Sequence, residues 1–216
     1  MKTIVSPSLL AADFTNLEAE IRRTEQSGAD MLHLDIMDGM FVTNLSFGVP
    51  VVSALRKITD ITFDTHLMVQ DPIRLIEKFA KAGSDYITFH IESDSDVGET
   101  IKLIKSFGVK AGLSVKPKTP IEAVYPYLDD LDLVLIMTVE PGYGGQSFMP
   151  DMLPKMTALK EEITKRGLST IIEVDGGVND KTGKQSVEAG ANALVAGTYL
   201  YASEQMAERT KLLQNL

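Results

Sequence analysis

The feature of this chain that most limits its possible folds is an alternation, repeated eight times, between short apolar runs and helix-like segments. Short apolar runs bounded by turn residues are typical of buried strands, and regular alternation with helices is typical of a parallel sheet. We predict strands at residues 4–10, 31–37, 62–68, 86–90, 110–115, 133–138, 171–175 and 193–196.

The number and spacing of these units favour a closed barrel. Four of the predicted strands follow a glycine that would end the preceding helix, at Gly28, Gly83, Gly108 and Gly190. Eight strand–helix pairs within 216 residues favour a (β/α)8 TIM barrel of the α/β class over a doubly wound sheet. Because no linker or low-complexity segment interrupts the chain, we expect a single catalytic domain spanning residues 1–216.

The composition excludes several classes of partner. With 30 acidic and 21 basic residues the net charge is −9, so the chain as a whole would repel nucleic acid. Cysteine is absent, which leaves His, Asp and Glu as the side chains available to bind a metal. We find neither a signal peptide nor an apolar run long enough to cross a bilayer, and expect no membrane association and a cytoplasmic location.

Polar residues gather where the predicted strands end, which in a barrel is the end that carries the chemistry. His33, Asp35 and Met37 would share one face of their strand, since side chains alternate between the two faces. The same alternation aligns His66 with Asp64 and Met68, and Asp175 with Glu173.

Two histidines and two carboxylates, His33, His66, Asp35 and Asp175, form a mixed nitrogen and oxygen ligand set suited to a divalent metal. Any one of them alone could equally be a hydrogen-bonded core residue or an ion-pair partner. For His90 and Glu92, a structural role and a role in supporting the metal ligands both remain open.

Glycine-rich segments follow the last three predicted strands: Gly142-Tyr143-Gly144-Gly145, Gly176-Gly177 and Gly197-Thr198. Phosphate sites in this type of barrel commonly use the loops after the last strands, where backbone N–H groups can approach the anion closely. Each segment alone would be an ordinary turn, but together they predict a phosphate site.

The sequence resembles the ribulose-phosphate 3-epimerase family over essentially its whole length, through motifs at residues 6–13, 33–39, 66–68, 137–148 and 173–178. The resemblance implies one divalent metal ion (Zn²⁺, Mn²⁺, Fe²⁺ or Co²⁺) bound by His33, Asp35, His66 and Asp175, with the two aspartates also acting as the acid/base pair. It implies substrate contacts from Ser8, His66, Met37, Met68 and Met137 in addition to the glycine-rich segments. For each methionine, simple core packing is the alternative.

The implied reaction is the interconversion of D-ribulose 5-phosphate and D-xylulose 5-phosphate, by two-base proton transfer at C3 through a metal-stabilised enediolate. We also expect a homo-oligomer. Met40, Thr43 and Tyr143 depart from the family pattern, which leaves loop rigidity and substrate preference open.

Three other functions compete with this one. A 3-epimerase for a ketohexose 6-phosphate, such as allulose 6-phosphate, would use the same residues. A related barrel decarboxylase or hexulose-phosphate synthase would carry Asp-x-Lys-x-x-Asp on a strand, and Met37 at the lysine position counts against it. A non-catalytic sugar-phosphate sensor would have no evident use for the metal ligands.

Overall fold

The computed structural model describes residues 2–216, in which eight parallel strands alternate with helices. The strands are β1 (Ile4–Pro7), β2 (Met31–Met37), β3 (Thr62–Met68), β4 (Tyr86–His90), β5 (Lys110–Val115), β6 (Leu133–Met137), β7 (Ile171–Asp175) and β8 (Ala193–Ala196). Six have the predicted bounds. The prediction placed the end of the first strand three residues too late, because Leu9–Ala11 turn into a short 3-10 helix, and the end of the sixth one residue too late.

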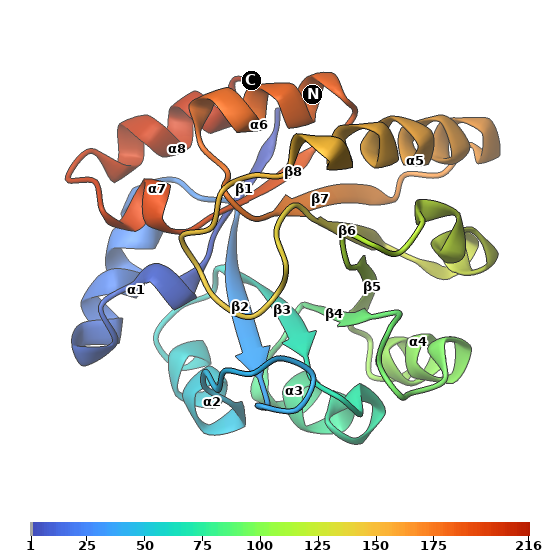
Figure 1. The fold of residues 1–216 in the computed structure, drawn as a ribbon. Helices are drawn as coiled ribbons and strands as arrows, with labels where there is room; N and C mark the ends of the chain where they lie inside the picture. The colour runs from blue at the N-terminus through green and yellow to red at the C-terminus, as the bar shows by residue number, and fades with distance from the viewer. Residues whose placement is uncertain (1) are drawn as a thin grey trace.

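The strands form a barrel. Their order in the sheet is β1-β8-β7-β6-β5-β4-β3-β2, and a bridge between Ser8 and His33 brings the two edge strands together. In Figure 1 the helices surround the strands, and the segment after β6 passes across the face of the barrel. The two ends of the chain are adjacent, since the Thr3 N–H donates to the Gln214 carbonyl. The predicted TIM-barrel fold is confirmed.

Helices cover the outside of the barrel. The α-helices are α1 (Leu17–Gln26), α2 (Val49–Arg56), α3 (Ile76–Ala82), α4 (Val97–Ser106), α5 (Leu153–Arg166), α6 (Asp180–Glu188), α7 (Thr198–Tyr201) and α8 (Met206–Gln214). The 3-10 segments are η1 (Leu9–Ala11), η2 (Phe14–Asn16), η3 (Pro72–Arg74), η4 (Ile121–Asp130) and η5 (Pro150–Met152). Within residues 2–216, every helix falls short of the length and apolarity that a membrane span requires.

Two local sequence signals explain where helices change or stop. Between β5 and β6 the chain forms the 3-10 helix η4 in place of an α-helix, and Pro126 within it lacks the N–H that an α-helical turn would use. Gly83 ends α3 with φ of 102°, a backbone conformation that side chains disfavour. A Cβ at this position would also lie 2.4 Å from the Arg56 side chain.

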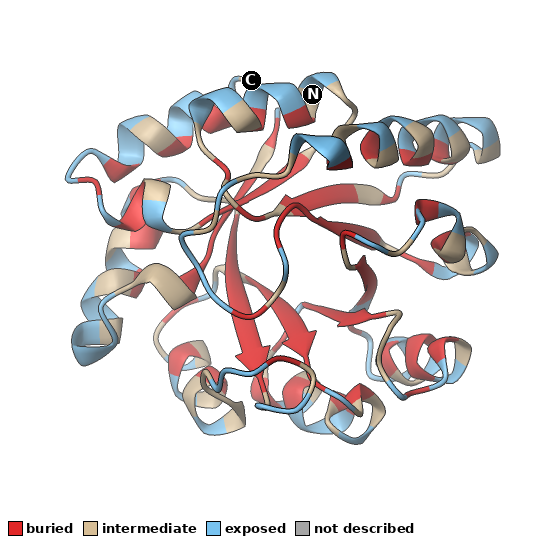
Figure 2. Cartoon of the chain, in the orientation of Figure 1, coloured by how far each residue is buried: buried red, intermediate tan, exposed pale blue. Residues whose placement is uncertain are grey.

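The core lies mainly between strands and helices. The outward side chains of β2, which are Leu32, Leu34 and Ile36, belong to one large buried apolar cluster with the helices. Figure 2 shows the strands almost wholly buried, whereas the helices bury one side and expose the other. Burial of such a side chain contributes about 1.5–3 kcal/mol, so this layer holds the barrel in shape.

Strand register sets the level of the polar residues inside the barrel. Asp35 is paired with His66 across β2 and β3, and Met37 with Met68 one step further. On the other side of the barrel Asp175 is level with Met137 of β6. The residues predicted to share inward faces therefore meet near the carboxyl ends of the strands.

Candidate active site

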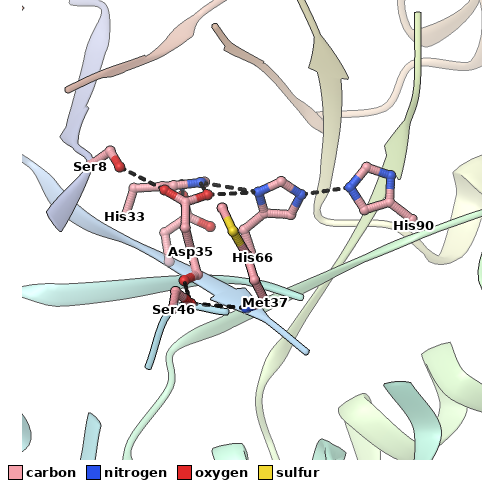
Figure 3. Close-up of polar contacts among 8 residues, drawn as sticks. Ser8, His33, Asp35, Met37, Ser46, His66 and His90 are labelled. Carbon is pink, nitrogen blue, oxygen red and sulfur yellow. Dashed lines mark hydrogen bonds and ion pairs between the residues drawn. The ribbon is translucent and has the colours of Figure 1, made fainter. Parts of the chain in front are cut away.

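Three donor atoms from β2 and β3 face one another at the mouth of the barrel. His33 Nε2 lies 3.4 Å from Asp35 Oδ1 and 3.4 Å from His66 Nδ1, while His66 Nδ1 lies 3.2 Å from Asp35 Oδ1. Asp175, from β7, completes a group of four whose potential ligand atoms all lie within 4.8 Å of one another. Figure 3 shows Asp35 and the two imidazoles converging.

The other oxygen of Asp35 is held by a neighbouring strand end. The Ser8 hydroxyl donates to Asp35 Oδ2 at 2.6 Å, a contact that follows from the bridge between Ser8 and His33. On the far side, the Ser46 hydroxyl donates to the Asp35 carbonyl at 2.5 Å and accepts from the Met37 N–H. These contacts, drawn in Figure 3, fix the end of β2 and the direction of its carboxylate.

The pKa values of Asp35 and Asp175 are shifted in opposite directions. Burial alone would raise the pKa of Asp35, but the charge and hydrogen bond of His33 hold it well below its ordinary value. Burial and then the charge of Asp35 raise the pKa of Asp175 to about 6. Two carboxyl groups with separated pKa values are the arrangement in which one is ionised while the other exchanges a proton.

A second pair of acidic residues, Asp64 and Glu173, lies next to His33. His33 Nδ1 contacts Asp64 Oδ2 at 2.5 Å, and both side chains are fully buried. Burial opposes protonation of His33, but Asp64 and Asp35 together raise its pKa well above the ordinary value. Glu173 is also fully buried, and burial followed by the charge of Asp64 raises its pKa well above the usual range. Burial and the neighbouring acid thus both favour the protonated form of Glu173.

The histidine that sequence reasoning left unassigned lies directly behind His66. His90 Nε2 is 2.8 Å from His66 Nε2, and His90 Nδ1 is 3.2 Å from Glu92 Oε2. Burial lowers the pKa of His90 to about 4, so the ring is neutral. Burial of Glu92 is outweighed by hydrogen bonds from His90, Thr119 and the Lys116 N–H, which lower its pKa to about 2.

A cavity of about 920 Å³ opens above the four clustered residues. Of the residues predicted to contact substrate, the following line it: Ser8, Met37, Met68, Met137, Gly142, Tyr143, Gly144, Gly145, Gly176, Gly177, Gly197 and Thr198. His66 does not line the cavity, because its fully buried ring lies behind Asp35. The Met37 side chain faces the cavity at the position where a barrel decarboxylase would carry lysine.

The loops predicted to bind phosphate meet along one wall of the cavity. Within residues 2–216, the backbone N–H groups of Gly177, Gly197 and Thr198 have no backbone acceptor. Gly177 has φ of 67°, and a Cβ there would lie 2.4 Å from the Phe148 nitrogen, so this close packing requires glycine. The arrangement leaves N–H groups available to an anion.

Two polar residues at the rim were missed by sequence reasoning as parts of the site. The Asn44 amide donates to the Gly142 carbonyl at 2.7 Å and links the loop after β2 to the loop after β6. Asn179 lines the cavity and caps α6, accepting from the Lys181 and Thr182 N–H groups. The pattern Asn179-x-x-Thr182 is a capping signal visible in the sequence, whereas no local signal pairs Asn44 with Gly142.

The fold and the site together define a class of protein: a TIM barrel with histidine and carboxylate side chains clustered under a cavity at the mouth. The chain belongs to the ribulose-phosphate 3-epimerase family, whose model matches residues 4–201. This confirms the family predicted from the motifs, and with it the prediction of an isomerase acting on carbohydrate phosphates.

Named relatives match over most of their length. A ribulose-phosphate 3-epimerase from Bacillus subtilis is 48% identical over 198 residues, covering 91% of each chain. One from Synechocystis is 44% identical and covers 98% of this chain and 93% of its own. The chloroplastic ribulose-5-phosphate-3-epimerase of Arabidopsis thaliana is also 44% identical and covers 96% of this chain and 75% of its own.

Solved structures resemble the fold at low sequence identity. The tryptophan synthase α-subunit of Pyrococcus furiosus superposes with a TM-score of 0.68 at 16% identity, covering 100% of this chain and 98% of its own. A 3-hexulose-6-phosphate synthase superposes with a TM-score of 0.66 at 18% identity, covering 100% and 99%. These likenesses support the barrel fold alone.

Proposed function

We propose that this protein is a metal-dependent 3-epimerase that interconverts D-ribulose 5-phosphate and D-xylulose 5-phosphate within a single catalytic domain. The observation that carries the proposal is the convergence of His33, Asp35, His66 and Asp175 within 4.8 Å at the floor of the cavity. Membership of the family and the names of the relatives support the substrate.

The spacing of the donor atoms fits a divalent cation. Zinc ligands at about 2.0–2.2 Å stand about 3.3–3.6 Å apart in a tetrahedron, and three of the pairs of potential ligand atoms here are 3.2–3.4 Å apart. The set contains two nitrogens and two carboxylates, which suits Zn²⁺, Mn²⁺, Fe²⁺ or Co²⁺. A cation held there would act as a Lewis acid on the substrate oxygens and stabilise the negative charge of the enediolate.

Asp35 and Asp175 supply the two proton-transfer groups in this proposal. Inversion at C3 requires a proton to leave one face of the sugar and another to arrive on the opposite face. Asp35 comes from β2 and Asp175 from β7, with β1 and β8 between them in the sheet, so the carboxylates approach from different sides of the barrel. Their separated pKa values support alternating roles as base and acid.

The remaining cavity residues hold the substrate in the proposal. The N–H groups of Gly177, Gly197 and Thr198 bind the phosphate, because backbone donors can serve an anion in a chain with few basic residues near the site. Met37, Met68 and Met137 provide soft apolar walls that do not compete for a hard cation. Ser8 orients Asp35 through the hydrogen bond to Oδ2.

The test is proton NMR of ribulose 5-phosphate in heavy water with the purified protein. The expected result is loss of the C3 proton signal and appearance of xylulose 5-phosphate, both stopped by a chelator and restored by added Mn²⁺ or Zn²⁺. Asp35→Asn and Asp175→Asn should each abolish exchange, whereas Asp60→Asn, an exposed carboxylate before β3, should not. Full exchange in both site variants would overturn the proposed roles.

Two further arms separate the competing functions. Ketohexose 6-phosphates, including allulose 6-phosphate, are assayed in parallel, and a higher kcat/KM for one of them would change the substrate and leave the mechanism intact. Tight binding of ribulose 5-phosphate without any isotope exchange would identify a sugar-phosphate sensor in place of an enzyme.

A further inference from the structure

A chain of buried contacts runs outward from His66, away from the cavity. His66 Nε2 is 2.8 Å from His90 Nε2, and His90 Nδ1 is 3.2 Å from Glu92 Oε2. Figure 3 shows His66 and His90 joined ring to ring, with His66 between Asp35 and His90. Both imidazoles are fully buried, and Glu92 marks the outer end, with 22% of its side chain exposed.

The direction of the hydrogen bonds in this chain is decided by proton counting. A neutral imidazole has one N–H and one bare nitrogen, so in the pair of Nε2 atoms one ring must donate and the other accept. If His90 donates, its bare Nδ1 faces the carboxylate of Glu92 and His66 carries its proton on Nδ1, on the cavity side. If His66 donates, His90 Nδ1–H faces Glu92, and the bare His66 Nδ1 lies 3.2 Å from Asp35 Oδ1, where a cation bound between the two would take the place of the missing proton.

Glu92 favours the second arrangement because a carboxylate can only accept, and at the other end of the chain the proposed cation, rather than a proton, lies between His66 and Asp35. We propose that Glu92, acting through His90, is a positioning residue that fixes His66 in the tautomer with Nε2 protonated and Nδ1 bare toward Asp35. His66 Nδ1 is then able to bind a cation, so this inference rests on the metal site of the proposed function. Glu92, which lies in the loop after β4, would thus set the tautomer of the metal-ligating His66 ring through His90.

The surroundings of Glu92 fix its orientation. Glu92 Oε1 accepts from the Lys116 N–H at 2.8 Å and from the Thr119 hydroxyl, which leaves Oε2 for His90. The Phe41 ring packs on His90 with centroids 4.8 Å apart. The Lys116 ammonium lies 3.6 Å from the centroid of the Phe41 ring. The His90 ring is therefore covered by Phe41 and fully buried, which keeps water from serving as an alternative partner of its nitrogens.

This geometry makes Glu92→Gln a direct test of the proposed tautomer of His66. The two donors at Oε1 attract the single amide oxygen, so the amide NH2 group faces His90 Nδ1 and donates to it. His90 would then carry its proton on Nε2 and donate to His66, which would place the His66 proton on Nδ1. A nearly isosteric change would in this way reverse every hydrogen bond in the chain and oppose metal binding.

The experiment compares Zn²⁺ affinity, by competition with a chelator, and the imidazole nitrogen spectrum of the Zn²⁺-loaded protein. In the wild type, His66 is expected protonated at Nε2 and His90 at Nδ1, with His90 Nε2 bare. Glu92→Gln should weaken Zn²⁺ binding by about 10–100-fold. Asp94→Asn, which removes one exposed charge from the same loop, should leave the affinity unchanged.

The His33 Nδ1 signal is an internal control, because that nitrogen contacts Asp64, whereas Nε2 of the same ring lies 3.4 Å from His66 Nδ1. A wild-type spectrum with His90 protonated at Nε2 would overturn the inference without any variant. Unchanged Zn²⁺ affinity in folded Glu92→Gln would also overturn it, while leaving the proposed function intact. Absence of Zn²⁺ binding by the wild type would overturn both.

Discussion

Replacement of Asp175 by asparagine should stabilise the metal-free protein at alkaline pH. The ordinary pKa of an aspartate is 3.8, and in the folded protein burial and the charge of Asp35 raise the pKa of Asp175 to about 6. A group whose pKa is raised on folding contributes full stability below its unfolded pKa and loses that contribution as the pH rises through the folded value.

The magnitude follows from the two pKa values. A rise from 3.8 to about 6 corresponds to about 3 kcal/mol, at about 1.36 kcal/mol for each tenfold change in acidity. Asparagine resembles the protonated carboxyl group at every pH. At pH 8 the chelator-treated Asp175→Asn variant should therefore be more stable than the wild type by up to about 3 kcal/mol, and at pH 4 the two should agree within about 1 kcal/mol.

Urea unfolding at pH 4 and pH 8, in the presence of a chelator, measures this difference. Part of the gain should disappear in an Asp35→Asn background, since the charge of Asp35 is the second cause of the raised pKa. Excess Zn²⁺ should reverse the sign, because a cation that binds the folded state stabilises it most when the carboxylate is present. Equal stability of chelator-treated wild type and variant at pH 8 would refute the reasoning.

Three other perturbations test separate parts of the site. Ser8→Ala removes the donor to Asp35 Oδ2 and should lower kcat about tenfold; steady-state kinetics showing a change in KM alone would contradict this role. Gly177→Ala combines a positive φ with a Cβ 2.4 Å from the Phe148 nitrogen, and urea unfolding should show a loss of at least about 2 kcal/mol. Gly144→Ala, with open space around its Cβ, is the control. Asn44→Ala loses the bond to the Gly142 carbonyl, and the KM for sugar phosphate should rise several-fold with Zn²⁺ affinity unchanged.

Much of the barrel could be predicted from the sequence because its signals are local. Six strands have the predicted bounds, since an apolar run bounded by turn residues marks a buried parallel strand wherever it lies. Alternation along β2 and β3 was enough to align His33 with Asp35, and Asp64 with His66, on inward faces. Prediction failed where a local conformation competed, as at Leu9–Ala11.

The relations between strands came only from the tertiary structure. Alternation along a strand predicts on which face a side chain lies. It does not predict which nitrogen of a histidine ring faces a neighbour, nor how close two side chains lie when they are far apart in the sequence. The role of His90 therefore stayed open in the sequence, and its contact with His66 and Glu92 appeared only once β3, β4 and the following loop were in register. The separated pKa values of Asp35 and Asp175 arise in the same way, because burial and charge act through space and depend on barrel closure. By itself the sequence determined which residues could carry the chemistry, and the packed barrel decided which of them meet and in what orientation.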